Sequence, residues 1–395
     1  MPVGLERTTR RGDLPAQASR RPRDSAAAVL RAILEHGPIA RSTVARASQL
    51  SAASVTGIVA SLLERGLIRE APEAAGPPGN GRPHVPLDIE PDRVAVIGAH
   101  VAVPRTTVAL LDLRGRVLAQ RQDPHGASDP GSVLAAIAVR VAELSDSPRE
   151  ILGVGLATGG WVDPTTGTVV DHHLLGWRDV PAGAVLAEAT GLPVWADCNS
   201  RALLRAEQLF GAAVRRAGAV HLFVGNVVDV AFSTDGVVHQ GPRSAAGVVA
   251  HLPVEGCTVV CACGRSGCLQ AAVSEQTLVR RALDAGLIDR PDFRALLDLA
   301  LHRAPAAVAL FEERARLVGR AAAVLLDLFD PEVLVVGEAG VNRMPGCLAT
   351  LRAEVAARSS AADVVRRSSF PGNVLAMAGG AVALDRVYAA PLACR

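Results

Sequence analysis

Near the N-terminus, apolar residues recur at helical spacing in three separate stretches. The first begins at Ser25 and ends at His36-Gly37-Pro38, and two more cover residues 41–47 and 52–65. Apolar residues three and four positions apart are typical of amphipathic helices, and Gly or Pro commonly marks a helix end. The pattern therefore predicts three short helices with a tight turn between the second and the third, where Ser51 is a candidate N-cap.

Two segments after the third helix have the character of short strands. They are residues 67–70 and 82–87, and a Pro- and Gly-rich loop separates them. Three helices followed by a two-stranded wing are typical of a winged helix-turn-helix domain, here residues 25–88. Because the third helix of such a domain fits the major groove of B-DNA, the pattern predicts a DNA-binding head. The alternative is a three-helix packing or dimerisation module.

The third helix exposes small residues at its N-terminal end once its apolar positions are turned inward. Such residues allow close approach to bases and phosphates but carry little charge. Arg41, Arg46 and Arg82 would therefore have to supply the electrostatic attraction. The candidate DNA-contacting residues are Arg41, Ser42, Thr43, Ser51, Ala52, Ala53, Ser54, Thr56, Gly57 and Arg82.

From residue 94 onward, short apolar runs alternate with longer amphipathic ones. This alternation predicts α/β layers with crossover connections, and about 300 residues exceed what one such layer normally holds. We therefore expect two α/β lobes, residues 94–200 and 201–395. The expected strands are 94–98, 107–112, 151–158, 193–196, 219–224, 230–233 and 333–336, and the expected helices are 132–144, 201–216 and 312–328.

Residues 1–24 are rich in Arg, Pro and Ser and show no apolar periodicity. Two interpretations fit them: a solvated disordered tail, or a basic arm that contacts phosphates. They contain no apolar core of a secretory signal. The longest charge-free stretch, 368–384, has 17 residues, whereas a membrane helix needs ~20. We therefore expect a cytoplasmic chain with no membrane partner. Aromatic residues make up only 3% of the chain, which argues against a base-stacking platform for single-stranded nucleic acid.

Four of the seven cysteines fall between Cys257 and Cys268. In a cytoplasmic chain, such a cluster favours metal or redox chemistry over a disulfide framework. Structural Zn²⁺ takes Cys and His ligands in a tetrahedron. Cys261, Cys263 and Cys268 would supply three thiolates. The fourth ligand would be either His251 or Cys257. Buried free thiols or a redox pair are the alternatives.

The arrangement from His251 to Cys268, a His followed by Cys-x-Cys-Gly-x2-Gly-Cys-Leu, resembles the zinc-loop signature of the ROK family of repressors, open reading frames and sugar kinases. The glycine-rich segment 159–164 resembles the sugar loop of that family, and residues 376–381 resemble its C-terminal helix. The winged helix followed by Gly81-Arg82-Pro83 is similar to the layout of its repressor branch.

This resemblance implies both a fold and a metal site. The implied fold class is α/β: a winged helix-turn-helix ahead of an actin-like (ribonuclease H-like) ATPase-type body, with two lobes around a cleft. Such bodies are usually dimeric or tetrameric. By the same resemblance, a structural Zn²⁺ is bound by His251, Cys261, Cys263 and Cys268, and Cys257 is a bystander.

The residues that match the ATP-binding turns of the family have changed. ROK kinases hold phosphate with an Asp-x-Gly-Gly-Thr turn, and here the matching positions hold His100, Ala102, Val103 and Pro104. A second turn, Gly-Thr-Gly-x-Gly, matches residues 226–230, which contain no glycine. Because glycines let backbone N–H groups close on phosphate oxygens, these changes predict that the chain is not an ATP-dependent kinase.

The residues that match the sugar site are partly kept. Asp197 stands where the family has its catalytic base, but Ala196 and Val248 replace an Asn and a Glu that bind sugar. A lone Asp at a strand end is also typical of a structural hydrogen-bond acceptor. We expect residues 171–173, which include two histidines, to lie in a surface loop. The candidate effector contacts are Gly160, Asp197, His251 and Gln270.

Together these features predict a sequence-specific transcriptional regulator, a repressor, that binds an inverted-repeat operator in double-stranded DNA as a homodimer or homotetramer. A sugar or another small metabolite bound between the lobes would shift the spacing of the DNA-binding heads. One alternative is a sugar kinase with an appended head, which requires the phosphate turns that have changed here. Another is a body that senses no ligand and serves only for dimerisation.

Overall fold

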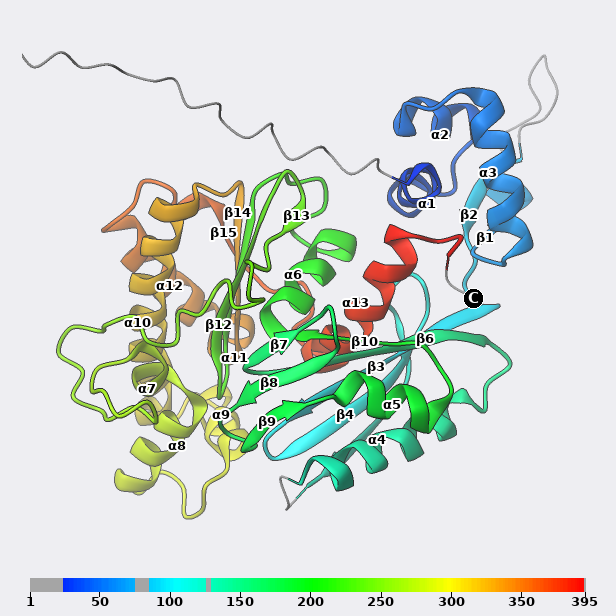
Figure 1. The fold of residues 1–395 in the computed structure, drawn as a ribbon. Coiled ribbons are helices and arrows are strands. Elements are labelled where there is room, and N and C mark those ends of the chain that lie inside the picture. The colour runs from blue at the N-terminus through cyan, green and yellow to red at the C-terminus, as the bar shows by residue number, and fades with distance from the viewer. Residues whose placement is uncertain (1–23, 75–84, 126–128, 394–395) are drawn as a thin grey trace, which may run out of the picture.

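The structure is a computed structural model that describes residues 24–74, 85–125 and 129–393. A small N-terminal head lies beside a larger body in which helices pack on the sheets (Figure 1). The fold is therefore the expected mixed α/β body preceded by a helical head. Among the helices of the described residues, none combines the length and the apolar character that crossing a bilayer requires.

The head has the predicted winged helix-turn-helix layout. β1 pairs antiparallel with β2, and Ile68 lies opposite Ile89. Val29, Val44 and Val59 pack into one buried cluster. The elements of the head are α1 (Ser25–His36), α2 (Arg41–Ser48), α3 (Ala52–Glu64), β1 (Ile68–Glu70), a short 3-10 turn (Pro72–Ala74) and β2 (Leu87–Ile89).

The second wing strand differs from the expected range, 82–87. β2 begins only at Leu87, because Leu87 and Ile89 alternate with Asp88 and both turn into the core of the head, where their exposed fractions are 0% and 1%. Pro86, just before the strand, lacks the N–H group that strand pairing uses. Half of the expected range, residues 82–84, lies outside the described residues, and this half includes Arg82.

The first lobe is built on a sheet with the strand order β10-β6-β3-β4-β5. β3 runs antiparallel to β4 and parallel to β6, so the sheet is mixed. Ile137 of α4 and Leu186 of α5 are buried against this sheet. The elements are β3 (Val94–Ala102), β4 (Arg105–Leu111), β5 (Val117–Pro124), α4 (Pro130–Ser145), β6 (Glu150–Thr158), α5 (Ala182–Thr190) and β10 (Val194–Cys198).

The C-terminal helix, α13 (Val374–Ala389), packs on the sheet of the first lobe, although the sequence assigned residues 201–395 to the second lobe. Glycines bring the helix and β3 into backbone contact: a Cβ on Gly98 would lie 2.2 Å from the backbone nitrogen of Gly380. The resemblance of residues 376–381 to the C-terminal helix of the family did not show which sheet the helix covers.

The second lobe has the strand order β13-β12-β11-β14-β15, and α6 (Asn199–Phe210) packs against both lobes. α6 ends at Phe210, before Gly211, and not at the expected residue 216. The remaining elements are β11 (Ala219–Val224), β12 (Val228–Thr234), β13 (Val237–Val238), α7 (Leu269–Val273), α8 (Glu275–Asp284), α9 (Phe293–Leu301), α10 (Pro305–Phe329), β14 (Val333–Glu338), α11 (Ala339–Arg343), α12 (Pro345–Ala356), a 3-10 turn (Ala362–Val364) and β15 (Val365–Arg367).

A small sheet, in the order β7-β8-β9, packs on the first lobe. It corrects the expectation of a surface loop at residues 171–173, because His172 ends β8 and is only 2% exposed. Burial lowers the pKa of His172 to about 4. His173, the next residue, is exposed as expected. The strands are β7 (Trp161–Asp163), β8 (Thr168–His172) and β9 (Trp177–Val180).

Candidate functional site

The N-terminal end of α3 exposes small side chains to solvent. Ser51 caps the helix, accepting a hydrogen bond from the backbone nitrogen of Ser54 at 3.1 Å. Thr56 turns its hydroxyl back to the carbonyl of Ala52 at 2.8 Å. A Cβ on Gly57 would meet nothing within 4 Å, so no other part of the described chain covers this face. The sequence-predicted α3 residues are all exposed: Ser51, Ala52, Ala53, Ser54, Thr56 and Gly57.

The candidate phosphate-contacting arginines on α2 already interact with other side chains of the head. Arg41 forms an ion pair with Glu70 at 2.8 Å, which offsets its charge. Arg46 is exposed and donates a hydrogen bond to the hydroxyl of Thr43 at 3.1 Å. Ser42 is exposed, at the first turn of a helix whose N-cap residue offers no side-chain cap. Free N–H groups at such a helix start favour an anion.

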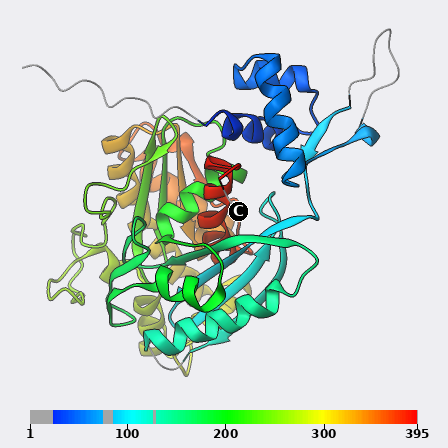
Figure 2. The same ribbon diagram turned by 45° about the vertical axis from the view of Figure 1, so that its right-hand side comes forward.

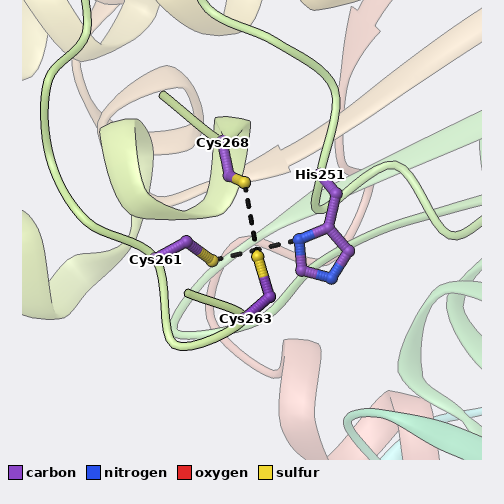
Figure 3. Close-up of side chains that lie close together, drawn as sticks. All are labelled: His251, Cys261, Cys263 and Cys268. Carbon is purple, nitrogen blue, oxygen red and sulfur yellow. Dashed lines mark hydrogen bonds between the residues drawn. The ribbon is translucent and has the colours of Figure 1, made fainter. Parts of the chain in front are cut away.

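The donor atoms of His251, Cys261, Cys263 and Cys268 converge, and all lie within 4.8 Å of one another (Figure 3). The sulfur atoms of Cys263 and Cys268 are 3.7 Å apart, and the sulfur of Cys261 lies 3.9 Å from Nδ1 of His251. A tetrahedral zinc ion with Zn–S bonds of about 2.3 Å separates its ligands by about 3.8 Å. The side chains therefore fit a tetrahedral metal ion. Cys257 is not part of the group.

Tight turns in the loop bring these side chains together. Gly264 and Gly267 both have positive φ angles, +84° and +77°. A Cβ on Gly267 would also lie 2.9 Å from the carbonyl oxygen of Cys257. The backbone nitrogen of Cys261 donates to the carbonyl of Arg265 at 2.8 Å and closes the turn. Glycine is required here because a side chain would strain or clash with the loop.

The thiols of the cluster have unequal surroundings. Arg265 donates a hydrogen bond to the sulfur of Cys263 at 3.5 Å and lowers the pKa of that thiol to about 6. Burial raises the pKa of Cys268 to about 11. Three sulfur atoms so close together repel one another when ionised, and a divalent cation removes this repulsion.

Asp197, the candidate effector contact at the end of β10, is held by the chain itself. Its side chain is 2% exposed. One carboxylate oxygen accepts hydrogen bonds from the backbone nitrogen of Cys198 at 2.7 Å and from Nε of Arg201 at 2.6 Å. The other oxygen contacts Arg205. Asp197 is therefore a buried hydrogen-bond acceptor, the second of the two roles that the sequence suggested.

Arg201 joins the two lobes around Asp197. Its Nη2 donates to the carbonyl oxygen of Val162 at 2.8 Å in the first lobe. Its Nη1 donates to the carbonyl oxygen of Ser244 at 3.0 Å, in the loop that leads to the metal cluster. Arg201 and Arg205 were not among the site residues predicted from the sequence, although a signal was available. Both follow Asp197 at helical spacing, four and eight residues later.

The other candidate effector contacts lie in the glycine-rich segment, on α7 and in the metal loop. Gln270 accepts a hydrogen bond from the backbone nitrogen of Val228 at 3.3 Å, and its Nε2 lies 3.1 Å from Nε2 of His173. This last contact connects the metal loop to the first lobe. Gly160 has a φ of +79°, and a Cβ there would lie 2.4 Å from the carbonyl oxygen of Asp171. His251 points its Nδ1 into the metal cluster.

The segments that match the phosphate turns contact each other directly. The side-chain amide of Asn226 donates to the carbonyl oxygen of Val103 at 3.4 Å. A Cβ on Gly159 would lie 2.4 Å from Cγ2 of Val227, so the second of these segments also packs against the glycine-rich segment that resembles the sugar loop. Triphosphate groups would have to enter between segments that already touch.

Two residues of the segments that match the phosphate turns, His100 and Asp229, are titratable groups whose pKa values are shifted by their surroundings. Burial lowers the pKa of His100 to about 4, and neither of its ring nitrogens has a hydrogen-bond partner among the described residues. Burial raises the pKa of Asp229 to about 7, against the opposing charge of Arg201. Both groups are therefore biased towards their uncharged forms.

Comparisons with known proteins agree with this architecture. Residues 96–371 match the ROK family, and residues 22–76 match the MarR family. "Transcriptional regulator Rv0485" of Mycobacterium tuberculosis (strain ATCC 25618 / H37Rv) is 34% identical over 387 residues, 93% of this chain and 87% of that protein. The "DNA-binding transcriptional dual regulator NagC" of Escherichia coli (strain K12) is 28% identical over 327 residues, 79% of each chain.

Solved structures show that regulators and kinases share this fold. A ROK family transcriptional regulator, described as a homolog of the E. coli MLC protein, matches 93% of this chain and 96% of its own, with a TM-score of 0.76 and 24% identity. A ROK family glucokinase from Streptomyces griseus matches 73% of this chain and 98% of its own, with a TM-score of 0.65 and 23% identity. Because the ROK match covers most of the chain and a full-length relative is 34% identical, this chain belongs to the ROK family, and it has the head-and-body architecture of the family's transcriptional regulators.

Proposed function

We propose that this chain is a sequence-specific repressor that reads double-stranded DNA with the N-terminal end of α3. The observation that carries the proposal is the exposed row of small residues from Ser51 to Gly57 on a head whose apolar face is buried. A helix end of this kind can enter the major groove and approach base edges closely. Arg46 and the N-terminus of α2 then contact phosphates, and Arg82 of the wing is assigned the same role.

The symmetry of a dimer predicts the arrangement of the two half-sites in the operator. ROK bodies usually form dimers, and a dimer carries two heads related by a two-fold axis. Such a pair reads an inverted repeat whose half-sites lie about 34–36 Å apart, one turn of B-DNA, or a multiple of that distance.

We propose that the body has no kinase activity. By resemblance, Asp197 occupies the place of the catalytic base, but Arg201 and Arg205 neutralise it, and both of its carboxylate oxygens already accept hydrogen bonds. The hydrogen bond from Asn226 to Val103 joins the two segments that match the phosphate turns. A coupled assay for sugar-dependent ADP formation is expected to show none above background. ADP formation that disappears in Asp197→Asn would contradict this proposal.

The metal is assigned as structural Zn²⁺, bound by His251, Cys261, Cys263 and Cys268. Three thiolates and one imidazole form a closed tetrahedral set, which is typical of structural rather than catalytic zinc. When bound, the ion neutralises the thiolates and fixes the loop that carries Ser244 and Gln270. Its chemistry is limited to holding this loop.

A small metabolite, a sugar in the first instance, is the proposed effector. Relatives of this chain are named as a putative xylose repressor and an N-acetylglucosamine repressor. The place for it is the cleft edge around Gly160, Gln270 and His251, with Asp197 behind. The contact between Gln270 and His173 connects the lobes, so a ligand that replaces it changes the geometry of the body.

Selection of genomic DNA fragments on the full chain tests the regulator proposal directly. Near-physiological salt suppresses nonspecific phosphate binding, so one inverted repeat is expected to be enriched. The matched control is Thr56→Glu, which places a negative charge on the exposed face of α3 without touching the core. We expect this variant to enrich nothing. Equal enrichment by both proteins, or no enrichment by the wild type, would contradict the proposal.

A further inference from the structure

The head and the first lobe share a continuous apolar core. Leu30 and Ile33 of α1 belong to the same buried cluster as Leu113 of the first lobe and Tyr388 of α13. Both ribbon views place α1 beside α13 (Figure 1, Figure 2). The hydroxyl of Tyr388 donates to the carbonyl oxygen of Leu113 at 2.7 Å, which fixes the end of α13. The angle of the head is therefore set by packing on α13 as well as by the connecting chain.

A run of alternating charges crosses this contact from the cleft to the head. Arg205 contacts Asp197, and its Nε lies 3.0 Å from a carboxylate oxygen of Asp385 on α13. The other oxygen of Asp385 lies 4.0 Å from Nη2 of Arg31 on α1. The side-chain exposure rises along this run: 2% for Asp197, 11% for Arg205, 27% for Asp385 and 40% for Arg31. The charge run thus begins at the buried cleft carboxylate and ends on the head.

Arg205 is the centre of the charge run. Burial opposes its positive charge, but Asp197 and Asp385 outweigh burial and raise the pKa of the guanidinium above its ordinary value. The side chain is therefore a cation shared by a cleft residue and a residue of α13. Whatever changes the hydrogen bonding of Asp197 also changes the attraction between Arg205 and Asp385.

The backbone of α13 packs directly against strands of the first lobe, so a shift of those strands also shifts the helix. A Cβ on Gly155 of β6 would lie 2.2 Å from the carbonyl oxygen of Gly379, and a Cβ on Gly379 would lie 2.6 Å from the backbone nitrogen of Ala99. Backbones in such close contact move together, since there is no free volume to absorb a shift. The helix that carries Asp385 is therefore coupled to β3 and β6 of the first lobe.

We propose that Arg205 and Asp385 are positioning residues for DNA binding: they hold the head at one angle to the body and couple that angle to the hydrogen bonding of Asp197. The inference rests on the proposed function, because the head angle matters for an operator with two half-sites. Any change in the hydrogen bonding of Asp197 would alter the hold of Arg205 on Asp385, and through Asp385 the hold on the head.

The experiment uses the full chain and the inverted repeat recovered by fragment selection. Binding is measured to this repeat and to versions whose half-sites are moved apart by one or two base pairs. A fixed head discriminates among these spacings, and a loosened head does not. In Asp385→Asn, we expect the wild-type preference for the selected spacing to fall about fivefold or more, whereas affinity for a single half-site stays the same. Asp385→Glu should restore the preference.

Arg205→Met provides the second arm. It should produce the same loss of spacing preference, and the double variant should be no worse than either single one, because both changes break the same run. The matched control is Asp123→Asn, which breaks an ion pair with Arg140 on the far side of the first lobe. Full spacing preference in Asp385→Asn, or additive effects of the two changes, would overturn the proposal.

Amide exchange separates this inference from the proposed function. In Asp385→Asn, amides of α1 should exchange about fivefold faster than in the wild type, and amides of α4 should not change. If the wild type selects no operator, the proposed function fails, and the exchange rate of α1 alone decides whether Asp385 positions the head. Unchanged α1 exchange in a folded variant would refute the positioning role whatever the DNA result.

Discussion

At the metal centre, His251 and three cysteines turn their donor atoms toward one another, whereas at Asp197 the arginines of the chain itself turn their charges toward the carboxylate. By family resemblance, both places are ligand sites. The first collects donors that repel one another when ionised, so it requires a cation from outside. The second is already neutralised by Arg201 and Arg205. One place thus gathers donor atoms that could hold a metal ion, and the other is held together by ion pairs within the chain.

Removal of the metal ligands should produce the largest effect of any change at these two places. In Cys261→Ser combined with Cys263→Ser, we expect the bound zinc to be lost and the free energy of unfolding to fall by about 5 kcal/mol, because binding energy at a structural zinc site is also folding energy. Metal content by mass spectrometry and thermal unfolding measure the two effects. Cys257→Ser, outside the donor group, is the control and should change neither. A double variant with unchanged metal content and melting temperature would disprove the metal assignment.

Opening the ion-pair network should have the next largest effect. Arg201→Met keeps much of the side-chain volume but removes one cation from Asp197 and leaves the carbonyl oxygens of Val162 and Ser244 without their donor. We expect a loss of about 3 kcal/mol in the free energy of unfolding, as is common when one partner of a buried pair is removed.

An exposed ion pair between Arg281 and Glu313 serves as the control for the buried pair of Arg201 and Asp197. Arg281 binds both carboxylate oxygens of Glu313, at 3.1 and 2.6 Å, but its side chain is 39% exposed. Arg281→Met should therefore cost less than about 1 kcal/mol. Equal costs for Arg201→Met and Arg281→Met in urea unfolding would mean that burial does not distinguish the cleft network.

The two sites also differ in how far the sequence could predict them. Cys261, Cys263, Cys268 and His251 lie within eighteen residues of one another, and local turns with glycines bring them together. The partners of Asp197 are harder to infer. Helical spacing could have indicated Arg201, but its carbonyl partners lie 39 and 43 residues away in sequence, and only the assembled cleft brings them near.

The fold also was predicted well where local sequence patterns decide it and poorly where contacts between distant residues do. The range of α3 and that of β11 were predicted to within one residue, because amphipathic period and strand-like runs are local signals. The sheet that α13 covers was not, since its glycine contacts with β3 join residues nearly three hundred positions apart. Short wing strands beside prolines, such as β2, are also poorly determined by local pattern.

Buried His100 predicts how the stability of the chain depends on pH. The pKa of His100 is lowered from 6.5 to about 4 by burial. Between these values, the unfolded chain binds a proton that the folded chain does not, so stability falls as the pH drops from about 6.5 toward 4. His100→Leu removes this contribution. The loss of stability between pH 7.5 and pH 5 should shrink by about 2 kcal/mol relative to the wild type.

Urea unfolding at the two pH values measures that difference, and other acid-sensitive groups cancel because they are present in both proteins. Exposed His302 gives the control, and His302→Gln should leave the pH dependence of the wild type unchanged. If His100→Leu has the same acid sensitivity as the wild type, His100 does not differ in protonation between the folded and unfolded chains.

The smallest expected effect concerns hexoses. A site whose carboxylate is occupied by arginines offers little to a sugar that relied on it, and Ala196 and Val248 provide no replacement. Millimolar glucose should therefore raise the melting temperature of the wild type by less than about 1 °C, because a ligand stabilises the folded state only in proportion to its occupancy. Arg205→Met frees one oxygen of Asp197 and should increase that shift. A large glucose shift in the wild type that Asp197→Asn abolishes would show that the cleft still binds sugar through its carboxylate, and the contrast with the metal centre would then disappear.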